Sequence, residues 1–548
     1  MKNIYILLTI VISSLFIYSC GEEFLDSQPL TDKNTATYYS TPEEAYEALA
    51  GCYDGLQRAS DAGVPMTLNS IMVADLCFTG FGAIDPDDYK MLDEHDKNVE
   101  PNFVSLFWPN WQEYYIAIYR ANLLIKKIGQ IDWSSAPAQK NIIEGEARFL
   151  RAYLYFDIVR MFENIPLLTE PTVEYVPQAD PDDVYKTITE DLLFAINNCS
   201  KDNFINSDNN GHANRWAAEA LLARVYLYYT GYYQKSDLVG RVTQAEALAY
   251  LEDLISTDYY GLLDNFYELW PAAQIYNEVK NGNNYMESLY VNEANKEIVF
   301  GIKYTYFSTY GPPPNTDGNH WSANFGLRGS GGYPDHGYGQ GWGGCTVVPE
   351  FYETWDTNDV RREYSVIDIE KEGIDYDFSG DKEYTGYFIK KYTPVCDTTG
   401  NDIASQFSSE QFWISQFQDY YSIRYSDVLL MAAELGSSNA LQYVNEVRDR
   451  AGLYDLEGSL TKDIIFNERK YELAFEGQRY WDLLRYDGKD NLNYAASHLD
   501  YNGTILRGGT ETQKIINGNN IKVTKGLWQI PKDEIILSND LLQQNEGW

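Results

Sequence analysis

Apolar residues recur at helical spacing over much of the first half of the chain. From Tyr114 to Ile128 they return close to every 3.6 residues, the repeat that places side chains on one face of an α-helix. The range 141–162 is apolar almost all round, which predicts a helix buried on every side. Further helices are predicted over the ranges 182–197, 214–229 and 243–255. Helices joined by short loops favour a stack of helical hairpins of the tetratricopeptide type, although no clean consensus of about 34 residues recurs.

The pattern changes between Asp258 and Phe412. Glycine, proline, asparagine and tyrosine dominate this stretch, and helical periodicity disappears. Two short runs, Glu297–Tyr304 and Tyr387–Tyr392, have the composition of strands. Loops of this length are usually functional or disordered, and the aromatic content argues against disorder. We therefore expect an irregular insert over 258–412.

Helical spacing returns after the insert. The elements predicted there are helices at 427–436, 438–451 and 462–485 and a strand-like piece at 527–531. The sequence therefore predicts a mainly α protein, a tetratricopeptide-like helical-hairpin scaffold with a loop-rich insert that contains short β-strands. The helical parts, 20–257 and 413–548, are expected to pack together as one body.

The N-terminus has the layout of an export signal. One lysine precedes an apolar run, Ile4–Tyr18, which is shorter than the roughly 20 residues of a membrane span and fits a secretory signal. A small residue before Cys20 resembles the lipobox of bacterial lipoproteins. Cleavage of residues 1–19 would leave Cys20 to carry acyl chains, which anchor a protein firmly when there are several. The acidic stretch 22–26 resembles the surface-export signal of Bacteroidetes lipoproteins; the alternative is an ordinary signal peptide with an incidental cysteine.

The charge balance limits the partners. The chain has 42 Lys and Arg against 81 Asp and Glu, a net charge of −39. Nucleic-acid binding depends on clustered basic residues, so nucleic acid is excluded as a partner. Docking on anionic lipid through basic patches is disfavoured for the same reason. The surface is suited to neutral or cationic ligands, and five histidines leave little room for a histidine-rich metal or acid–base centre.

The cysteines after Cys20 are far apart and form no CxxC pair, so neither a zinc ribbon nor a thioredoxin-type site is predicted. They are Cys52, Cys77, Cys199, Cys345 and Cys396. We expect buried free thiols; one or two disulfides are the alternative, whose pairing the sequence does not give.

Several segments together resemble a known family. The matching segments are NERKYELAFEGQRYWDLLR at 467–485, IPKDE at 530–534, QNEGW at 544–548, RYSDVLLMAAE at 424–434 and GEARFLRA at 145–152. These segments are spread over essentially the whole mature chain, and they occur in the same order as in the family named next. On these motifs the chain resembles the SusD/RagB family, surface lipoproteins of Bacteroidetes that capture nutrients for a partner transporter. Trp548 stands where the family more often has tyrosine.

The resemblance implies a tetratricopeptide-like scaffold, an outer-membrane location at the cell surface, a lipid anchor on Cys20, and delivery of the ligand to a SusC-like TonB-dependent transporter. Within the 467–485 motif, Arg469, Arg479 and Arg485 can hold carboxylates bidentately. We therefore interpret the motif as architectural and not as catalytic.

The candidate ligand site is the segment from Tyr304 to Trp355. It sets aromatic rings among glycines, where they can lie open as platforms for sugar rings, with polar side chains at the rim for the hydroxyls. In the resembled family the ligand site is likewise formed by loops outside the repeats. The stacking candidates are Trp321, Trp342, Tyr333 and Tyr338, and the polar candidates are Asp317, Asn319, His320 and Arg328. The alternative is a self-packed Ω-loop whose aromatic residues fill its own small core.

Two further groups are weaker candidates. Phe78, Phe81 and Trp108 lie near the acidic range 85–88 and either complete the ligand site or belong to the core. The stretch 375–381 resembles the first half of a calcium loop. Its candidate ligands are Asp375, Asp377, Ser379 and Asp381, but Gly386 replaces the glutamate expected at the twelfth position. A solvated acidic turn is the alternative, and no other cofactor is predicted.

Enzyme motifs are missing, since the sequence contains no HExxH, GxSxG or P-loop. The main hypothesis is a non-catalytic glycan-binding lipoprotein of the cell surface that delivers oligosaccharide to its transporter. The alternatives are a peptide-binding RagB-like uptake lipoprotein, a glycoside hydrolase whose paired carboxylates cannot be judged from sequence, and a helical adaptor without a small ligand.

Overall fold

The computed structural model describes residues 38–85, 89–96, 98, 105–205, 207, 210–285, 295–309, 315–329, 331–403, 405 and 411–548. Cys20 and the predicted signal segment lie outside these residues. Within the described ranges no helix is both long and apolar enough to cross a membrane.

The helices before the insert are α2 (Pro42–Asp61), α3 (Met66–Met72), α4 (Lys90–Asp93), α5 (Trp108–Lys127), α6 (Gln139–Phe162), α7 (Pro181–Asn198), α8 (Arg215–Tyr233) and α9 (Gln244–Ile255). The helices predicted between 114 and 255 are confirmed, with ends that differ by at most a turn or two. Helix α2, which the periodicity did not predict, begins after Thr41, whose hydroxyl and Glu44 form a capping box.

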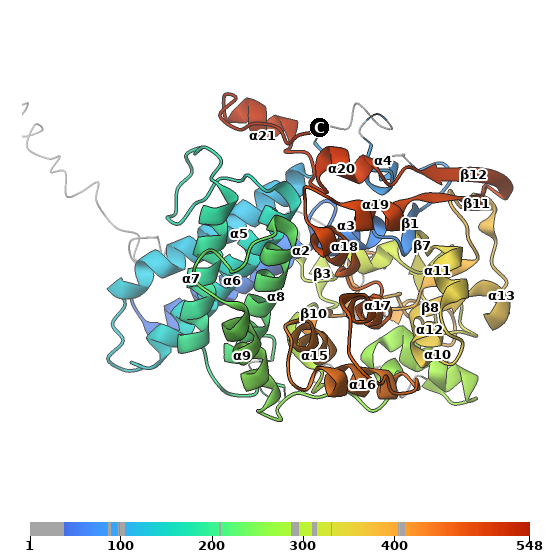
Figure 1. The fold of residues 1–548 in the computed structure, drawn as a ribbon, viewed down its shortest axis with the longest axis horizontal. Helices are drawn as coiled ribbons and strands as arrows, with labels where there is room; N and C mark the ends of the chain where they lie inside the picture. The colour runs from blue at the N-terminus through green and yellow to red at the C-terminus, as the bar shows by residue number, and fades with distance from the viewer. Residues whose placement is uncertain are drawn as a thin grey trace, which may run out of the picture.

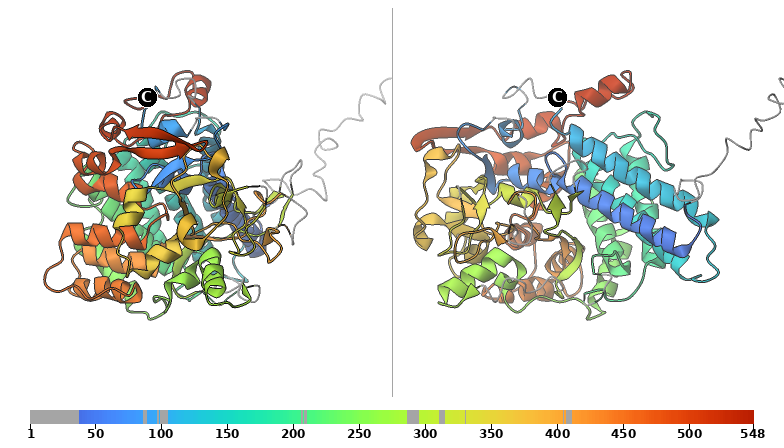
Figure 2. Two further views of the ribbon diagram at one scale, coloured as in Figure 1. Left: turned by 90° about the vertical axis from the view of Figure 1, so that its right-hand side faces the viewer. Right: turned by 180° about the vertical axis from the view of Figure 1, so that it is seen from behind.

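Consecutive helices of this part pack against one another as hairpins. Helix α2 packs on α5, α5 on α6, α6 on α7, α7 on α8 and α8 on α9. Figure 1 shows these helices, coloured from blue to green, on one side of the molecule. In the view from behind in Figure 2, α2 runs alongside the lighter blue helix α5. The mainly α, hairpin-stack architecture is therefore confirmed.

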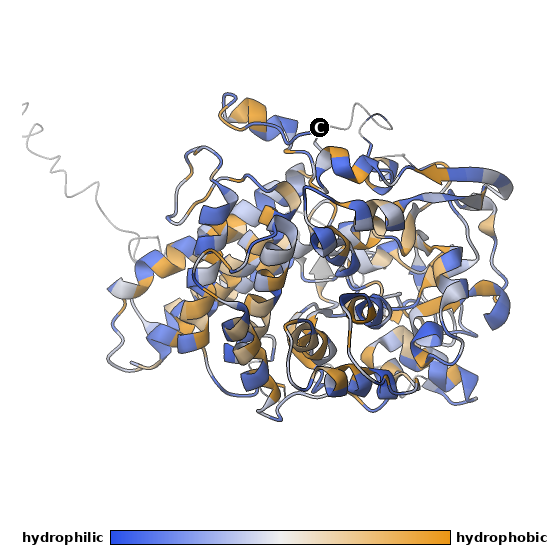
Figure 3. Ribbon diagram, viewed as in Figure 1, coloured by the Kyte–Doolittle hydropathy of each residue, from blue (hydrophilic) through white to orange (hydrophobic). Residues whose placement is uncertain are grey.

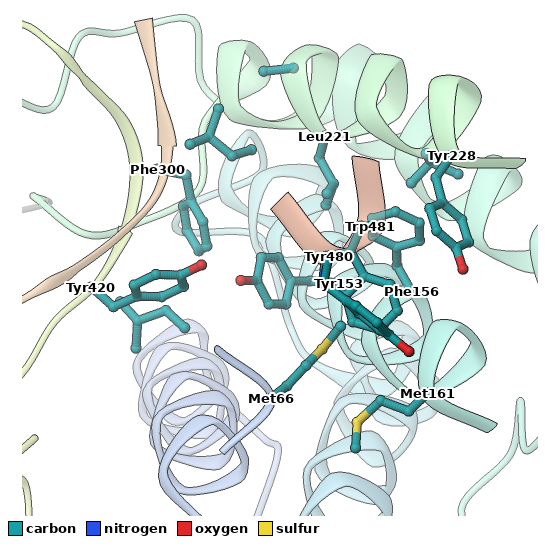
Figure 4. Packing of buried hydrophobic residues seen from close by; sticks show 14 of the residues in the cluster. Met66, Tyr153, Phe156, Met161, Leu221, Tyr228, Phe300, Tyr420, Tyr480 and Trp481 are labelled. Carbon is teal, nitrogen blue, oxygen red and sulfur yellow. The ribbon is translucent and has the colours of Figure 1, made fainter. Parts of the chain in front are cut away.

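Helix α6 is buried along most of its length, as its apolar composition predicts. Its neighbours α2, α5 and α7 cover different faces of it. Figure 4 shows Phe156 of α6, Leu221 of α8 and Trp481 of the C-terminal part in one packed layer. In Figure 3, apolar residues concentrate where the helices meet. The hydrophobic core thus joins segments that are far apart in the sequence.

The strands are β1 (Cys77–Gly80), β2 (Ile298–Ile302), β3 (Ser308–Thr309), β4 (Asn315–Thr316), β5 (Leu327–Arg328), β6 (Gln340–Gly341), β7 (Gly344–Val347), β8 (Val366–Asp368), β9 (Tyr387–Ile389), β10 (Tyr420–Arg424), β11 (Tyr501–Arg507) and β12 (Thr510–Ile516). The two predicted strands correspond to β2 and β9. Within the described residues the strands form two-stranded sheets, antiparallel except for the pair β5–β6.

Two of these sheets connect the insert to the rest of the chain. Strand β7 pairs with β1, with Cys77 opposite Val347. Strand β2 pairs with β10, with Tyr420 opposite Ile302. The short helices of the insert are α10 (Pro271–Lys280), η5 (Trp321–Asn324), α11 (Pro349–Thr354), α12 (Val360–Ser365) and α13 (Ile369–Glu372).

The helices after the insert are α15 (Tyr425–Glu434), α16 (Ala440–Arg450), α17 (Lys462–Glu472), α18 (Arg479–Asp487), α19 (Asn493–Leu499), α20 (Asn520–Thr524) and α21 (Lys532–Leu537). Helix α15 packs on α8 and α9, and α18 packs on α8. In Figure 1, α15–α18 lie between the N-terminal stack and the insert, whereas α20 and α21, coloured red, lie along the top of the molecule.

The prediction of a single helix over 462–485 is wrong. The chain leaves the helix after Glu472 and resumes at Arg479, because Phe475 and Gly477 adopt left-handed backbone conformations with φ of 62° and 78°. A Cβ on Gly477 would also lie 3.0 Å from the hydroxyl of Ser70. The break lets α18 turn toward α3 and α8.

The strand expected at 527–531 is also absent. This segment is extended but pairs with no strand; instead the Trp528 amide donates to the carbonyl of Met161 at 2.8 Å. The C-terminal sheet is the hairpin β11–β12, which turns at Gly508-Gly509. Figure 3 shows its tip as hydrophilic.

Ion pairs between buried residues tie the 467–485 motif to the scaffold. Arg424, 1% exposed, binds Glu476 at 2.7 Å and Glu472 at 2.9 Å. Arg469 binds Asp482 at 2.8 Å, and Arg479 binds Asp75 at 2.6 Å. The carboxylates of the motif are therefore occupied by arginines, which agrees with an architectural role.

The five cysteines of the described ranges are free and buried, so the prediction of free thiols is confirmed. Burial raises the pKa of the Cys52 and Cys396 thiols to about 12, which keeps both protonated.

Candidate functional site

Trp321 lies inside the core, and the expectation that it forms an open platform is wrong. It is 1% exposed and makes edge-to-face contacts with Tyr392 at 4.9 Å and Phe325 at 5.5 Å between ring centroids. Trp321 is the first residue of η5, and its amide donates to Asp61 at the end of α2. This anchoring turns the indole toward the core.

Tyr338 and Asn319 are buried as well, which corrects their assignment to an open site. The Tyr338 hydroxyl donates to Glu372 at 2.7 Å, and its ring stacks on His336. The Asn319 side chain accepts from the Ser322 amide at 3.1 Å and donates to the Gln418 carbonyl at 2.7 Å. Both side chains hold loops of the insert in place.

Asp317 is half-buried beside α2. Its carbonyl accepts hydrogen bonds from the Thr305 amide and the Gln57 side chain. Burial and the nearby Asp54 raise the pKa of the Asp317 carboxyl. None of these contacts involves the predicted stacking residues.

Four partly exposed rings form what we call the aromatic cluster: His320, Trp342, Phe412 and Trp413. The centroids of Trp342 and Trp413 are 6.3 Å apart, with ring planes inclined by 36°. Phe412 stands edge-on to Trp342 at 6.3 Å, and His320 stands edge-on to Trp413 at 6.4 Å. Because none of the four is fully buried, the cluster can present ring faces to a ligand.

A carboxylate beneath the cluster fixes His320. Asp61 accepts from the backbone amides of His320 and Trp321, and its Oδ2 lies 3.1 Å from Nδ1 of His320. Burial raises the pKa of Asp61 to about 6, although His320 and the two amides oppose this shift. The imidazole is thereby held edge-on to Trp413.

Arg328 connects the cluster to the loop after β1. Its Nη1 donates to the carbonyl of Trp342 at 3.1 Å and to Oδ2 of Asp85 at 3.0 Å. Asp85 also accepts from the amide of Gly82 at 2.8 Å. A Cβ on Gly82 would lie 2.5 Å from the guanidinium, so only glycine leaves room for this position of Arg328.

Beyond Arg328 lies a second feature, which we call the acidic cavity. Its volume is about 590 Å³, and its lining includes Arg328, Tyr333, Asp375, Asp377 and Asp381. The remaining lining is Gly329, Gly331, Gly332, Ser379 and Gly380. The cavity thus joins the predicted sugar loop to the predicted calcium loop, which the sequence treated as separate candidates.

All four candidate calcium ligands line the acidic cavity. In the described ranges no group of three or more His, Cys, Asp or Glu side chains is placed to hold a metal ion. Asp377 instead accepts from the Ser379 amide at 3.0 Å, and Asp381 accepts from the Tyr376 hydroxyl at 2.7 Å. These side chains form a turn and one wall of the acidic cavity.

A larger cavity, of about 680 Å³, lies elsewhere, between α5, the loop 166–176 and α21. Its lining is mainly apolar and includes Trp111, Tyr115, Ile116 and Val173. Trp108 belongs to this side of the molecule, since its indole donates to Glu534 at 2.8 Å. Polar side chains such as Gln112, Arg120 and Glu174 also line this cavity, but none of the residues predicted for the ligand site does.

The structure therefore keeps Trp342, His320, Arg328 and Tyr333 of the predicted site close to a partly exposed surface. It adds residues that the sequence analysis missed, namely Phe412, Trp413 and the ion-pair partner Asp85. The adjacent aromatic pair at 412–413 could have indicated part of the site. It was missed because it lies at the expected end of the insert, outside the candidate segment from Tyr304 to Trp355.

The fold is a helical-hairpin scaffold with an inserted lobe, and the lobe and the segment at Trp413 together form a partly exposed aromatic and acidic surface. Two family models match the chain: one described as "SusD family" over residues 365–548, the other as "Starch-binding associating with outer membrane" over 85–227. A SusD-like protein P2 of Formosa agariphila is 25% identical over 99% of both chains. A SusD-like protein of Bacteroides ovatus is 25% identical over 89% of this chain and 84% of that relative.

Solved structures share the fold. Surface glycan-binding protein A of Bacteroides thetaiotaomicron, in complex with laminarihexaose, superimposes with a TM-score of 0.70 at 23% identity, over 93% of this chain and 100% of that chain. A laminarin-binding SusD-like protein gives a TM-score of 0.68 at 25% identity, with the same coverage. The resemblance to the SusD/RagB family is confirmed: two family models match parts of the chain, and it is similar to SusD-like proteins over nearly its whole length.

Proposed function

We propose that this chain is a non-catalytic glycan-binding protein of the outer-membrane surface. The observation that carries the proposal is the aromatic cluster, in which Trp342 and Trp413 offer two inclined, partly exposed rings beside hydrogen-bonding side chains. Sugar rings stack their apolar faces on such rings, and their hydroxyls bind polar groups at the rim. The relatives with this fold that are named for laminarin and glycan binding support the same ligand class.

In this proposal the protein captures oligosaccharide and passes it, unaltered, to a SusC-like TonB-dependent transporter. Affinity at a single open site is modest, because stacking and a few hydrogen bonds must offset the entropy of association. A lipid anchor on Cys20 would keep the protein beside its transporter and raise the local ligand concentration.

A peptide ligand is the second candidate, because the acidic cavity favours a basic side chain. Lysine or arginine of a peptide would pair with Asp375 and Asp377, both of which are exposed. This alternative predicts that the cavity carries the affinity and that the aromatic cluster contributes little.

The test is a calorimetric titration of the soluble chain from residue 21 onward, against a panel of plant, host and microbial oligosaccharides and a basic peptide mixture. We expect saturable binding of an oligosaccharide that chromatography recovers intact. Replacing both Trp342 and Trp413 by alanine should weaken it by more than about tenfold, whereas Tyr454→Ala, at a residue 94% exposed in another loop, should leave it unchanged. Sugar cleavage would indicate a hydrolase, and binding of peptides alone would favour the second candidate.

A further inference from the structure

The acidic cavity begins where the aromatic cluster ends. Arg328 lines the cavity and also donates to the carbonyl of Trp342, so the two features share one wall. Four glycines leave this cavity open; a Cβ on Gly331 or Gly380 would meet no atom within 4 Å. A volume of about 590 Å³ is in the range of small-ligand pockets and accommodates a sugar ring.

The charge of the cavity is negative. Among its described lining residues Arg328 is the one cation, and it is already paired with Asp85 at 3.0 Å. Asp375, Asp377 and Asp381 form no ion pair with Arg328, although the guanidinium is near enough to Asp381 to oppose the effect of burial, which raises the pKa of that carboxyl to about 6. Together with burial, these three carboxylates raise the pKa of Tyr333 to about 12, so its phenol stays protonated and able to donate.

Asp381 offers an acceptor that the protein does not use. The residue is 2% exposed, and its Oδ2 accepts from the Tyr376 hydroxyl. Its Oδ1 is buried and has no hydrogen-bond partner among the described residues. A buried acceptor without a donor is unfavourable, and because Asp381 lines the cavity, a small rotation of its carboxylate would let a ligand hydroxyl donate to it.

From this arrangement we infer that the acidic cavity is a subsite for an uncharged, hydroxyl-rich sugar unit, and that it excludes sugars carrying carboxylate or sulfate groups. The inference rests on the proposed function and adds the class of glycan. A uronate or sulfate ester in the cavity would face three carboxylates and find its one arginine occupied by Asp85, and like charges at close range oppose binding. A sugar hydroxyl can donate to the free acceptor of Asp381, and a sugar oxygen can accept from the phenol of Tyr333.

The test compares oligosaccharides of matched length by calorimetry. The uncharged probes are laminarihexaose, cellohexaose, maltohexaose, xylohexaose and mannohexaose; the anionic probes are the hexamers of galacturonate and mannuronate, alongside a sulfated carrageenan oligosaccharide. We expect the best uncharged probe to bind at least about thirtyfold more tightly than any anionic probe. A tighter anionic ligand would overturn the inference.

Three variants locate the effect. Asp381→Ala should weaken the best uncharged probe about tenfold, the usual scale for a hydrogen bond to a charged group. Because that variant can disturb Tyr376, Gly380→Trp is the second test: it fills the cavity from an open position and should weaken binding similarly at unchanged thermal stability. Asp375→Lys with Asp377→Lys should gain galacturonate binding, whereas Asp264→Lys, at a residue 93% exposed elsewhere, should not.

The outcomes distinguish failure of the cavity as a subsite from failure of the proposed glycan-binding function. If an uncharged probe binds and depends on Trp342 but neither Asp381→Ala nor Gly380→Trp weakens it, the cavity is not a subsite, although the proposed function stands. If no oligosaccharide binds, the proposed function fails and the subsite with it. If only the basic peptides bind, and they depend on Asp375, the cavity receives a cation and the inference is wrong.

Discussion

The indoles of Trp342 and Trp413 lie 6.3 Å apart with their planes inclined by 36°, although one belongs to the turn between β6 and β7 and the other follows the insert. Each ring therefore limits the orientation of the other. At this distance, a sugar unit that stacks on one indole lies within reach of the second.

This contact predicts coupled effects on binding. Trp342→Ala and Trp413→Ala should each weaken the oligosaccharide about tenfold, and the double variant should lose less than the product of both, since removing one indole frees its neighbour to move. Calorimetry on the four proteins measures the coupling. Tyr454→Ala is the control, and single variants within twofold of the parent would show that the cluster is not the binding surface.

The position of the Arg328 guanidinium depends on Gly82, because this residue has no side chain to occupy the same space. Gly82→Ala should push the guanidinium away from Asp85 and Trp342, because the new Cβ would lie 2.5 Å from it. We expect a loss of affinity about as large as for Arg328→Ala. Gly129→Ala, where a Cβ meets no atom within 4 Å, is the matched control and should leave binding unchanged. Equal affinity of the Gly82 variant and the parent would exclude Arg328 as an organising residue.

Helices with long, regular apolar periodicity could be predicted from the sequence, whereas helix breaks caused by left-handed backbone conformations could not. Helix α6 could be predicted because its sequence is apolar almost all round, and the structure shows that other helices cover it. The break at Phe475 and Gly477 lies inside a motif whose residues favour a helix, so only the packing against α3 reveals it. The hairpin β11–β12 was missed because its alternation of exposed and half-buried residues is weak in hydropathy.

In the site, residue type was predictable but exposure was not. Trp321 and Trp342 occur in the same glycine-rich segment, yet one packs on Tyr392 and the other remains partly exposed. The two indoles differ in exposure because their tertiary partners differ. Trp321 packs in the core around β10, whereas Trp342 contacts the segment at Trp413. Tertiary partners of this kind are invisible to a pattern within one segment.

Stability below neutral pH should depend on His95. The residue is 4% exposed, and its ring lies nearly parallel to those of Tyr480 and Trp528, at 5.8 and 5.3 Å between ring centroids. Burial lowers its pKa from 6.5 to about 4. Between these values the unfolded chain binds a proton that the folded protein does not, so the free energy of unfolding falls as pH is lowered from about 6.5 to 4. The expected loss is about 3 kcal/mol.

Urea denaturation at several pH values measures this slope. His95→Asn should lower stability at neutral pH, because a packed ring is removed, but it should flatten the dependence between pH 6.5 and 4. Asparagine tolerates the left-handed backbone of this position, where φ is 47°. His498→Asn, at an exposed residue, should keep the parental slope. A slope that persists in the His95 variant would assign it to other groups.

The buried ion pairs around Arg424 should matter more to folding than any surface pair. Arg424 donates to Glu476 through Nε at 2.7 Å and to Glu472 through Nη1 at 2.9 Å. Arg424→Met would leave buried carboxylates short of a partner, at a cost of about 3–5 kcal/mol. Arg241→Met removes a half-exposed pair with Glu190 and should cost less than about 1 kcal/mol. Chemical denaturation of both variants compares the two. A loss below 1 kcal/mol for Arg424→Met would mean that the other cations at these carboxylates, Lys391 at Glu476 and Arg450 at Glu472, are sufficient partners for them.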